Sequence, residues 1–92
     1  MPQIFRIGGY MVYFWSNESK PLEALHVHIS KGKPSANATK VWITQNGKCI
    51  LENNNSRIPP KTLNLLIRAI EANVEDVINK WIEQFDDITY IC

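Results

Sequence analysis

Two histidines one residue apart are the feature of this sequence best suited to chemistry. His26 and His28 flank Val27, and alternate side chains of a β-strand point to the same face, so both imidazoles would project together. Imidazole titrates near neutral pH and also binds transition metals. The pair therefore suits an acid and a base, two metal ligands, or a structural or partner-contact role without reaction chemistry.

Each chemical role needs further residues. Zinc takes three or four protein ligands, and the additional donors that the sequence offers near the pair are Glu18, Glu23 and Cys49. Cleavage of a phosphodiester without a metal would need cations for the phosphate. The cations available for this are Lys31, Lys33, Lys40 and Arg57. No catalytic or cofactor motif of known spacing accompanies them, so we expect no cofactor and leave enzymatic activity open.

The histidines lie in a region whose patterns predict strands. Residues 4–7 and 10–15 are rich in β-branched and aromatic residues, and Gly8 and Gly9 between them suit the positive φ angles of a two-residue hairpin turn. Residues 25–30 alternate, with Leu, Val and Ile on one face and His, His and Ser on the other. We expect a hairpin followed by a strand with one apolar side.

A second hairpin is predicted further along the chain. Strand-like runs at 40–45 and 48–52 are joined by Asn46 and Gly47. Both residue types tolerate the left-handed region that a type I′ turn requires. The strands together predict an antiparallel sheet of four or five members.

The last third of the sequence changes to a helical pattern over about 60–86. Apolar residues recur there at spacings of three and four, and Pro59-Pro60 can open a helix. The apolar stripe stays in phase, which favours one long helix. Two helices with a break near Asn73 are the alternative, with Asp76 in the first turn of the second.

These elements predict an α+β fold, a single domain over 1–92 that is strand-rich in 1–56 and helical in 60–86. The helix should cover the sheet face of Leu25, Val27 and Ile29. That face also takes one of two alternating sets from the 10–15 strand, either Tyr10, Val12 and Phe14 or Met11, Tyr13 and Trp15. The opposite face would carry His26, His28 and Trp42 as a binding surface, unless the loops at 16–24 and 31–39 fold over it. An open face implies that His26→Ala costs little stability.

Composition limits the function classes. The 92 residues are 45% hydrophobic with a net charge of +1, which gives no overall attraction to nucleic acid or membrane. Charge is nevertheless uneven, because residues 1–62 hold eight basic and three acidic groups (+5) and residues 63–92 hold two and six (−4). Lys31, Lys33 and Arg57 therefore belong to a basic segment suited to an anionic partner such as RNA.

The sequence also favours a reduced setting. Two cysteines, Cys49 and Cys92, are too few for a disulfide framework. No segment has the roughly 18 apolar residues of a membrane helix, and the N-terminus lacks a signal-peptide pattern. We expect a cytoplasmic protein with no membrane partner.

Several motifs together resemble a known family. They are Met1-Pro2 with Ile4, the aromatic strand 10–15 followed by Ser16-Asn17-Glu18, Pro21, His26-Val27-His28-Ile29, the strand with Trp42, and the terminal helix with Leu63, Ile67 and Trp81. With these the chain resembles the bacterial domain-of-unknown-function family 4160 (DUF4160). Members commonly have proline directly before the first histidine, where this chain has Leu25.

The resemblance implies a small cytoplasmic bacterial protein, often encoded beside a second small gene and therefore suggested to belong to toxin–antitoxin-like pairs. It implies no established reaction, so His26 and His28 carry over as pattern positions without a role. Three hypotheses result: an interaction module for a small protein encoded nearby, an RNA-directed binder or nuclease that uses the histidine pair, and a metal-binding domain. Self-association into a homodimer through an edge strand is compatible with the first.

Overall fold

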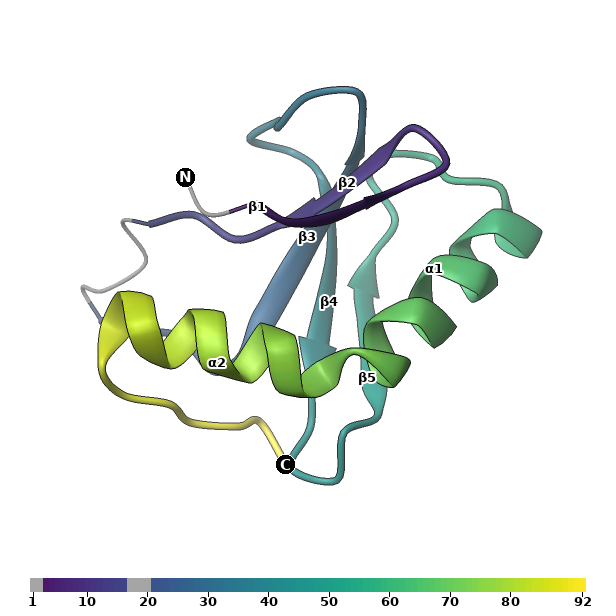
Figure 1. Ribbon diagram of the computed structural model, residues 1–92. Helices are drawn as coiled ribbons and strands as arrows, with labels where there is room; N and C mark the ends of the chain where they lie inside the picture. Colours follow the sequence, from purple (N-terminus) through teal and green to yellow (C-terminus); the bar gives the residue numbers. More distant parts are fainter. Residues whose placement is uncertain (1–2, 17–20) are drawn as a thin grey trace.

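The computed structural model describes residues 3–16 and 21–92, and the strands among them form one antiparallel sheet (Figure 1). The strands are β1 (Gln3–Ile7), β2 (Tyr10–Tyr13), β3 (His26–Lys31), β4 (Thr39–Ile43) and β5 (Cys49–Asn53). Their order in the sheet is β1-β2-β3-β4-β5, so each strand pairs with its neighbour in sequence. The predicted α+β class and sheet are confirmed.

The two hairpin turns differ in type. Gly8 and Gly9 both have positive φ, at 52° and 86°, and connect the paired residues Ile7 and Tyr10. This is the two-residue turn that the sequence predicts.

The prediction of a type I′ turn at Asn46-Gly47 is wrong. Gly47 has a φ of 80°, whereas Asn46 is not among the described residues with positive φ. The Gly47 N–H donates to Thr44 O and the Thr44 N–H donates to Lys48 O, each at 2.9 Å. The turn therefore has three residues, with Gly47 alone in the left-handed region.

Two helices follow the sheet, α1 (Pro60–Ala72) and α2 (Val74–Phe85). Of the two helical alternatives, the structure has the break at Asn73. The backbone of Asn73 leaves helical geometry at φ −117° and ψ 26°, and its side-chain Nδ2 donates to Ala69 O at 2.8 Å. An asparagine side chain that bonds the preceding turn competes with the backbone ladder, which accounts for the interruption. Glu75 and Asp76 lie in the first turn of α2.

Both helices pack on one face of the sheet and close the main core there. On that face, the alternating set that the 10–15 strand contributes is Val12 and Phe14, with Tyr10 partly buried beside them. Phe14 contacts Trp81 of α2, with ring centroids 5.0 Å apart. Met11 and Tyr13 point to the other face, where they form a second small cluster with Ala38.

The segment after α2 returns along the end of the sheet at which β3 begins and β4 ends (Figure 1). Thr89 O accepts the Leu25 N–H at 2.8 Å and Cys92 O accepts the Gln45 N–H at 3.0 Å. These bonds fix the chain just before β3 and just after β4. Neither helix of the described chain is long and apolar enough to cross a membrane.

Candidate functional site

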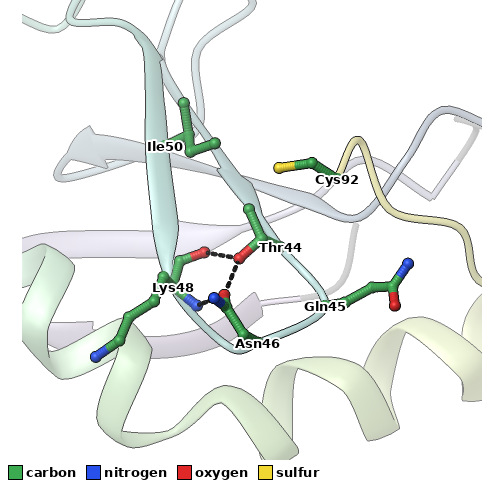
Figure 2. Close-up of a pocket in the computed structure, with 6 residues that line it drawn as sticks. All are labelled: Thr44, Gln45, Asn46, Lys48, Ile50 and Cys92. Carbon is green, nitrogen blue, oxygen red and sulfur yellow. Dashed lines mark hydrogen bonds between the residues drawn. The ribbon is translucent and has the colours of Figure 1, made fainter.

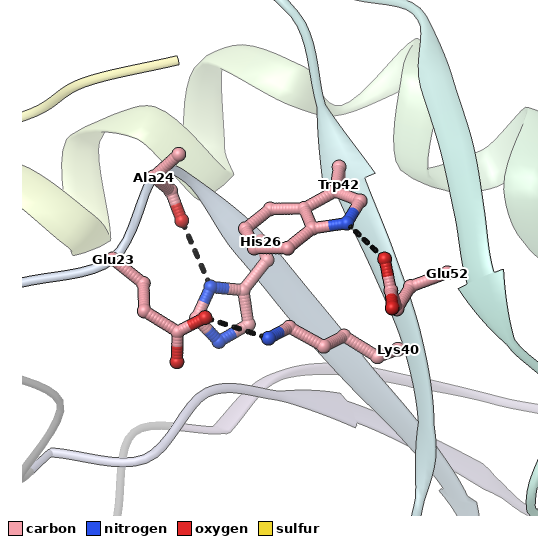
Figure 3. Close-up of polar contacts among 6 residues, drawn as sticks. All are labelled: Glu23, Ala24, His26, Lys40, Trp42 and Glu52. Carbon is pink, nitrogen blue, oxygen red and sulfur yellow. Dashed lines mark hydrogen bonds and ion pairs between the residues drawn. The ribbon is translucent and has the colours of Figure 1, made fainter. Parts of the chain in front are cut away.

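The imidazole of His26 lies inside the protein, at the start of β3. Its side chain has no exposed surface, and its ring centroid is 5.3 Å from that of Trp81 and 5.4 Å from that of Trp42. The ring Nδ1 lies 2.9 Å from Ala24 O (Figure 3). Because a carbonyl can only accept, the proton is on Nδ1, and in the neutral ring Nε2 carries the lone pair.

His28 is also buried, with 8% of its surface exposed. Its ring stacks on Tyr13 at a centroid distance of 5.7 Å and meets the His26 ring edge-on at 5.2 Å. Burial, and next the electrostatic interactions with His26 and Lys40, lower the pKa of His28 from 6.5 to about 4, although Glu23 and a backbone hydrogen bond with Ala38 act in the opposite direction. The His28 ring is therefore neutral at physiological pH.

An ion pair and an indole cover the histidine pair on the side of β4. Lys40 Nζ is 2.7 Å from Glu23 Oε1 and 4.3 Å from the centroid of the Trp42 ring (Figure 3). The indole N–H of Trp42 donates to Glu52 Oε1 at 2.8 Å. Lys40 is thus held by a carboxylate and an aromatic face, and its role as a phosphate-binding cation stays a prediction.

The loop between β3 and β4 covers the other side. The Tyr13 hydroxyl donates to Ser35 O at 3.0 Å and accepts from the Ser35 N–H at 3.1 Å. Ala38, at the end of the same loop, packs on Met11 and Tyr13. The alternation placed the histidines on the correct face, but the expectation of an open face is wrong for them, because this loop folds over it.

This geometry limits what the histidines can do chemically. A general acid or base must reach the proton that it transfers, whereas His26 is fully buried and His28 nearly so. Among the described residues no group of three or more His, Cys, Asp or Glu side chains is arranged to hold a metal ion. Glu18, one of the donors considered for a metal, lies outside the described residues. The catalytic and metal roles of the pair stay predictions.

The two lysines and the arginine of the expected binding surface do not join the histidines in one patch, whereas Trp42 contacts His26. Lys31 and Lys33 are exposed and line a cavity of about 490 Å³ at the end of β3, together with Asn55 and other polar residues. Arg57 is exposed in the loop before α1, with a φ of 54°. Trp42 is half-buried on β4. The predicted surface is therefore divided between a basic end of the sheet and the region of Trp42.

Strand β5 forms one edge of the sheet and carries two large exposed side chains that the sequence analysis did not select. Ile50 and Leu51 are each 43% exposed. Ile50 pairs with Trp42 across β4 and β5, whereas Leu51 pairs with Val41 and points to the other face. The sequence does contain a signal for these exposed side chains. The run Cys49-Ile50-Leu51 interrupts the apolar–polar alternation and must place apolar side chains on both faces of the strand.

A cavity of about 510 Å³ adjoins Ile50 at the turn between β4 and β5. Figure 2 shows Ile50, Thr44 and Cys92 around it, with the side chain of Lys48 directed away. The Thr44 hydroxyl lies 2.9 Å from Lys48 O and also contacts the Asn46 side chain. The cavity wall on this side is therefore held by the turn itself. We name Trp42, Ile50 and Leu51 with this cavity the β5 patch.

One end of the β5 edge is occupied by a side chain of α1. Glu71 Oε2 accepts the backbone N–H of Cys49 at 2.9 Å. Burial raises the pKa of the Cys49 thiol to about 12, with Glu71 acting in the same direction. Without a bound metal, the Cys49 thiol is therefore protonated at neutral pH and a poor nucleophile.

A five-stranded antiparallel sheet with two C-terminal helices on one face and a covered histidine pair on the other defines a small α+β protein. A family model described as "Domain of unknown function (DUF4160)" matches residues 9–82. The chain belongs to this family. No curated protein matches the chain, and neither does any solved structure.

Proposed function

We propose that this protein is a cytoplasmic bacterial interaction module that binds a small protein partner, encoded beside it in a toxin–antitoxin-like unit, through the β5 patch. The observation that carries the proposal is an edge strand with two exposed aliphatic side chains, Ile50 and Leu51, of which Ile50 also lines a cavity. An edge strand with exposed apolar side chains can pair with a strand of another chain. Proteins that do not bind a partner there protect the edge with charged side chains or cover it with a helix or loop.

The patch has the composition of a protein interface. Trp42 and Ile50 are cross-strand neighbours on one face, and a half-buried tryptophan next to an exposed aliphatic residue is the kind of pair that dominates binding energy. The cavity beside Ile50 offers room for one anchoring side chain of a partner. A partner with an aromatic or aliphatic anchor at the edge of its own sheet would match both features.

Glu71 restricts how such a partner can bind. Because its carboxylate accepts the Cys49 N–H, the outer edge of β5 is closed at its first residue. Backbone pairing is therefore expected from Leu51 to Asn53, and the contacts at Ile50 and Trp42 are made by side chains. The buried histidines stabilise the sheet beneath the patch and do not contact the partner.

The test is co-expression with the product of the adjacent gene, followed by size exclusion and titration calorimetry of the purified pair. Ile50→Lys places a charge in the patch and should weaken binding at least tenfold. Ile82→Lys is the matched control, because Ile82 is 41% exposed but lies on α2, and it should bind like the wild type.

Three outcomes would refute the proposal. They are the absence of a complex at micromolar concentrations, equal affinity of the Ile50→Lys and Ile82→Lys variants, and self-association of the chain alone that Ile50→Lys abolishes. The last outcome would assign the patch to a second copy and would confirm the homodimer considered from the sequence. Unfolding of each variant, followed by circular dichroism, separates loss of binding from loss of fold.

A further inference from the structure

A second surface lies where the loop from β3 to β4 meets the loop that precedes α1, at the opposite end of β4 and β5 from the cavity of the β5 patch. The cavity of about 490 Å³ at this place is lined by Lys31, Lys33, Ser35, Asn37 and Asn55, among others. Its lining contains hydroxyls, amides and ammonium groups and no carboxylate. The surface therefore offers hydrogen-bond donors and positive charge to a ligand.

The positive charge at this cavity is not neutralised within the described part of the chain. Lys31 and Lys33 are exposed, and the ion pair that the described residues form joins Lys40 to Glu23. Arg57 does not line the cavity, but it follows Ser56, which does, and adds a third exposed cation next to it in sequence. Three cations without counter-charges at one end of a sheet attract an anion.

Lys31 is the last residue of β3, and the loops that carry Lys33 and Arg57 are tied to the sheet by hydrogen bonds. The Ser30 hydroxyl donates to Lys33 O at 2.6 Å, and the Ser56 hydroxyl donates to Ile29 O at 2.8 Å. Asn54 Oδ1 accepts the Ile58 N–H at 3.1 Å, which closes the second loop around Arg57. The cations are therefore presented from ordered backbone, so binding costs little loop entropy.

Arg57 is in an unfavourable backbone conformation for its residue type. Its φ of 54° places a long side chain in the left-handed region, which costs about 1 kcal/mol relative to glycine or asparagine at such a position. The Arg57 N–H donates to Asn54 O at 2.9 Å and holds this conformation. Backbone strain of this kind is concentrated at functional sites. The held conformation also fixes the direction in which the Arg57 side chain leaves the backbone.

We propose that this cavity binds the phosphate backbone of single-stranded RNA, with Lys31, Lys33 and Arg57 as the phosphate-binding residues. The exposed lysines border an open cavity larger than one phosphate group needs, so a chain of phosphates fits better than an isolated anion. The amides of Asn37 and Asn55 provide donors and acceptors for ribose hydroxyls and base edges, as RNA recognition requires. The acidic residues Glu75 and Asp76 lie on α2, away from this end of the sheet (Figure 1), and would orient the RNA toward it.

The proposal concerns binding and does not depend on the β5 patch or on the histidines. Because the two surfaces are separate, a protein partner on β5 and RNA on the cavity could bind together. The Ile50→Lys variant should therefore bind RNA with wild-type affinity, and failure of one proposal leaves the other intact.

The experiment is fluorescence anisotropy of a labelled 12-nucleotide single-stranded RNA of mixed sequence, titrated with the full chain at several salt concentrations. Three phosphate contacts predict a slope of about −2 in log K against log salt, since each contact contributes about −0.7 on a single strand. The double variant Lys31→Ala, Lys33→Ala should bind at least tenfold more weakly at low salt, with a slope reduced by about 1.4. Arg57→Ala should lower the affinity for RNA by about threefold or more.

The matched control is the double variant Arg68→Ala, Lys80→Ala, which removes the same charge from exposed positions on α1 and α2. It should bind RNA within twofold of the wild type. If both double variants weaken RNA binding equally, the RNA is attracted by overall charge rather than by this site, and the proposal is overturned. Binding that does not depend on salt, or no binding at 0.1 mM protein, would also overturn it.

Two further arms identify the source of the phosphate. Single-stranded DNA of the same sequence should bind more weakly than RNA, because it lacks the ribose hydroxyl. Equal affinity for DNA would overturn the assignment to RNA. Displacement of the RNA by inorganic phosphate or a mononucleotide at low millimolar concentration would show a site for one phosphate and would equally contradict it.

Discussion

The imidazole of His26 meets the indole of Trp81 edge-on, with ring centroids 5.3 Å apart. The contact joins the start of β3 to the middle of α2, and both side chains are completely buried. A histidine that the sequence pattern suggested for surface chemistry is thus part of the packing between sheet and helix.

Replacing His26 with Ala should therefore destabilise the protein by about 2–4 kcal/mol, as other buried large-to-small substitutions do. His26→Phe keeps the ring contacts and loses the hydrogen bond to Ala24 O, so it should cost about 1 kcal/mol. Urea unfolding followed by tryptophan fluorescence measures both. An Ala variant as stable as the wild type would instead support the open face that the sequence analysis expected.

The depressed pKa of His28 predicts acid sensitivity. Its pKa is about 4 in the folded protein and 6.5 when unperturbed, so between these values the unfolded chain binds the proton and the folded chain does not. Stability is therefore complete above pH 6.5 and falls as the pH decreases toward 4, by up to about 3 kcal/mol from this residue.

The measurement for His28 is the free energy of unfolding from pH 7 to pH 4.5, in the wild type and in His28→Gln. The variant should be less stable at pH 7 and should change less with pH, because glutamine does not titrate. Carboxyl groups contribute equally to both proteins, so the difference between the two curves isolates His28. If the two stability curves are parallel, His28 has the same pKa in the folded and the unfolded protein, and the predicted acid sensitivity is wrong.

The sequence predicted the sheet well because its pattern is local. Each strand pairs with its sequence neighbour, so the alternation within each strand and the two short hairpin turns carry most of the information. Alternation could not choose between the Val12 and Met11 sets, since both are apolar, and the choice depends on the contact of Phe14 with Trp81. The break at Asn73 likewise depends on one side-chain hydrogen bond, which leaves the apolar stripe of the helices in phase.

The candidate site was harder to predict. The type and spacing of His26 and His28 placed them on one face correctly, but their burial depends on contacts between distant parts of the chain. His26 packs on Trp81, and Tyr13, which stacks on His28, is bound by Ser35, 22 positions away. No periodic pattern records such a contact. The exposed pair Ile50 and Leu51 was detectable as a local break in alternation, and its position at the sheet edge required the strand order.

Trp81 and its neighbour Ile82 provide a direct test of the core. Trp81 is completely buried and Ile82 is 41% exposed on the same helix. Trp81→Ala should cost about 3–5 kcal/mol, whereas Ile82→Ala should stay within about 1 kcal/mol of the wild type. Thermal unfolding followed by far-ultraviolet circular dichroism compares the two. Similar losses for both would place the packing face of α2 elsewhere.

The two cysteines should differ strongly in reactivity. A thiol with a pKa of about 12, as Cys49 has, holds about a thousandfold less thiolate at pH 8 than one with a pKa near 9, and only the thiolate attacks a disulfide reagent. Reaction with Ellman's reagent should therefore give one fast phase from the exposed Cys92 and one much slower phase, and Cys92→Ser should keep only the slow one. Glu71→Gln retains an acceptor for the Cys49 N–H but removes the charge that helps to raise the thiol pKa, so it should accelerate the slow phase without unfolding the protein. Two phases of equal rate, or a slow phase whose rate is unchanged in Glu71→Gln, would show that the carboxylate does not act on Cys49.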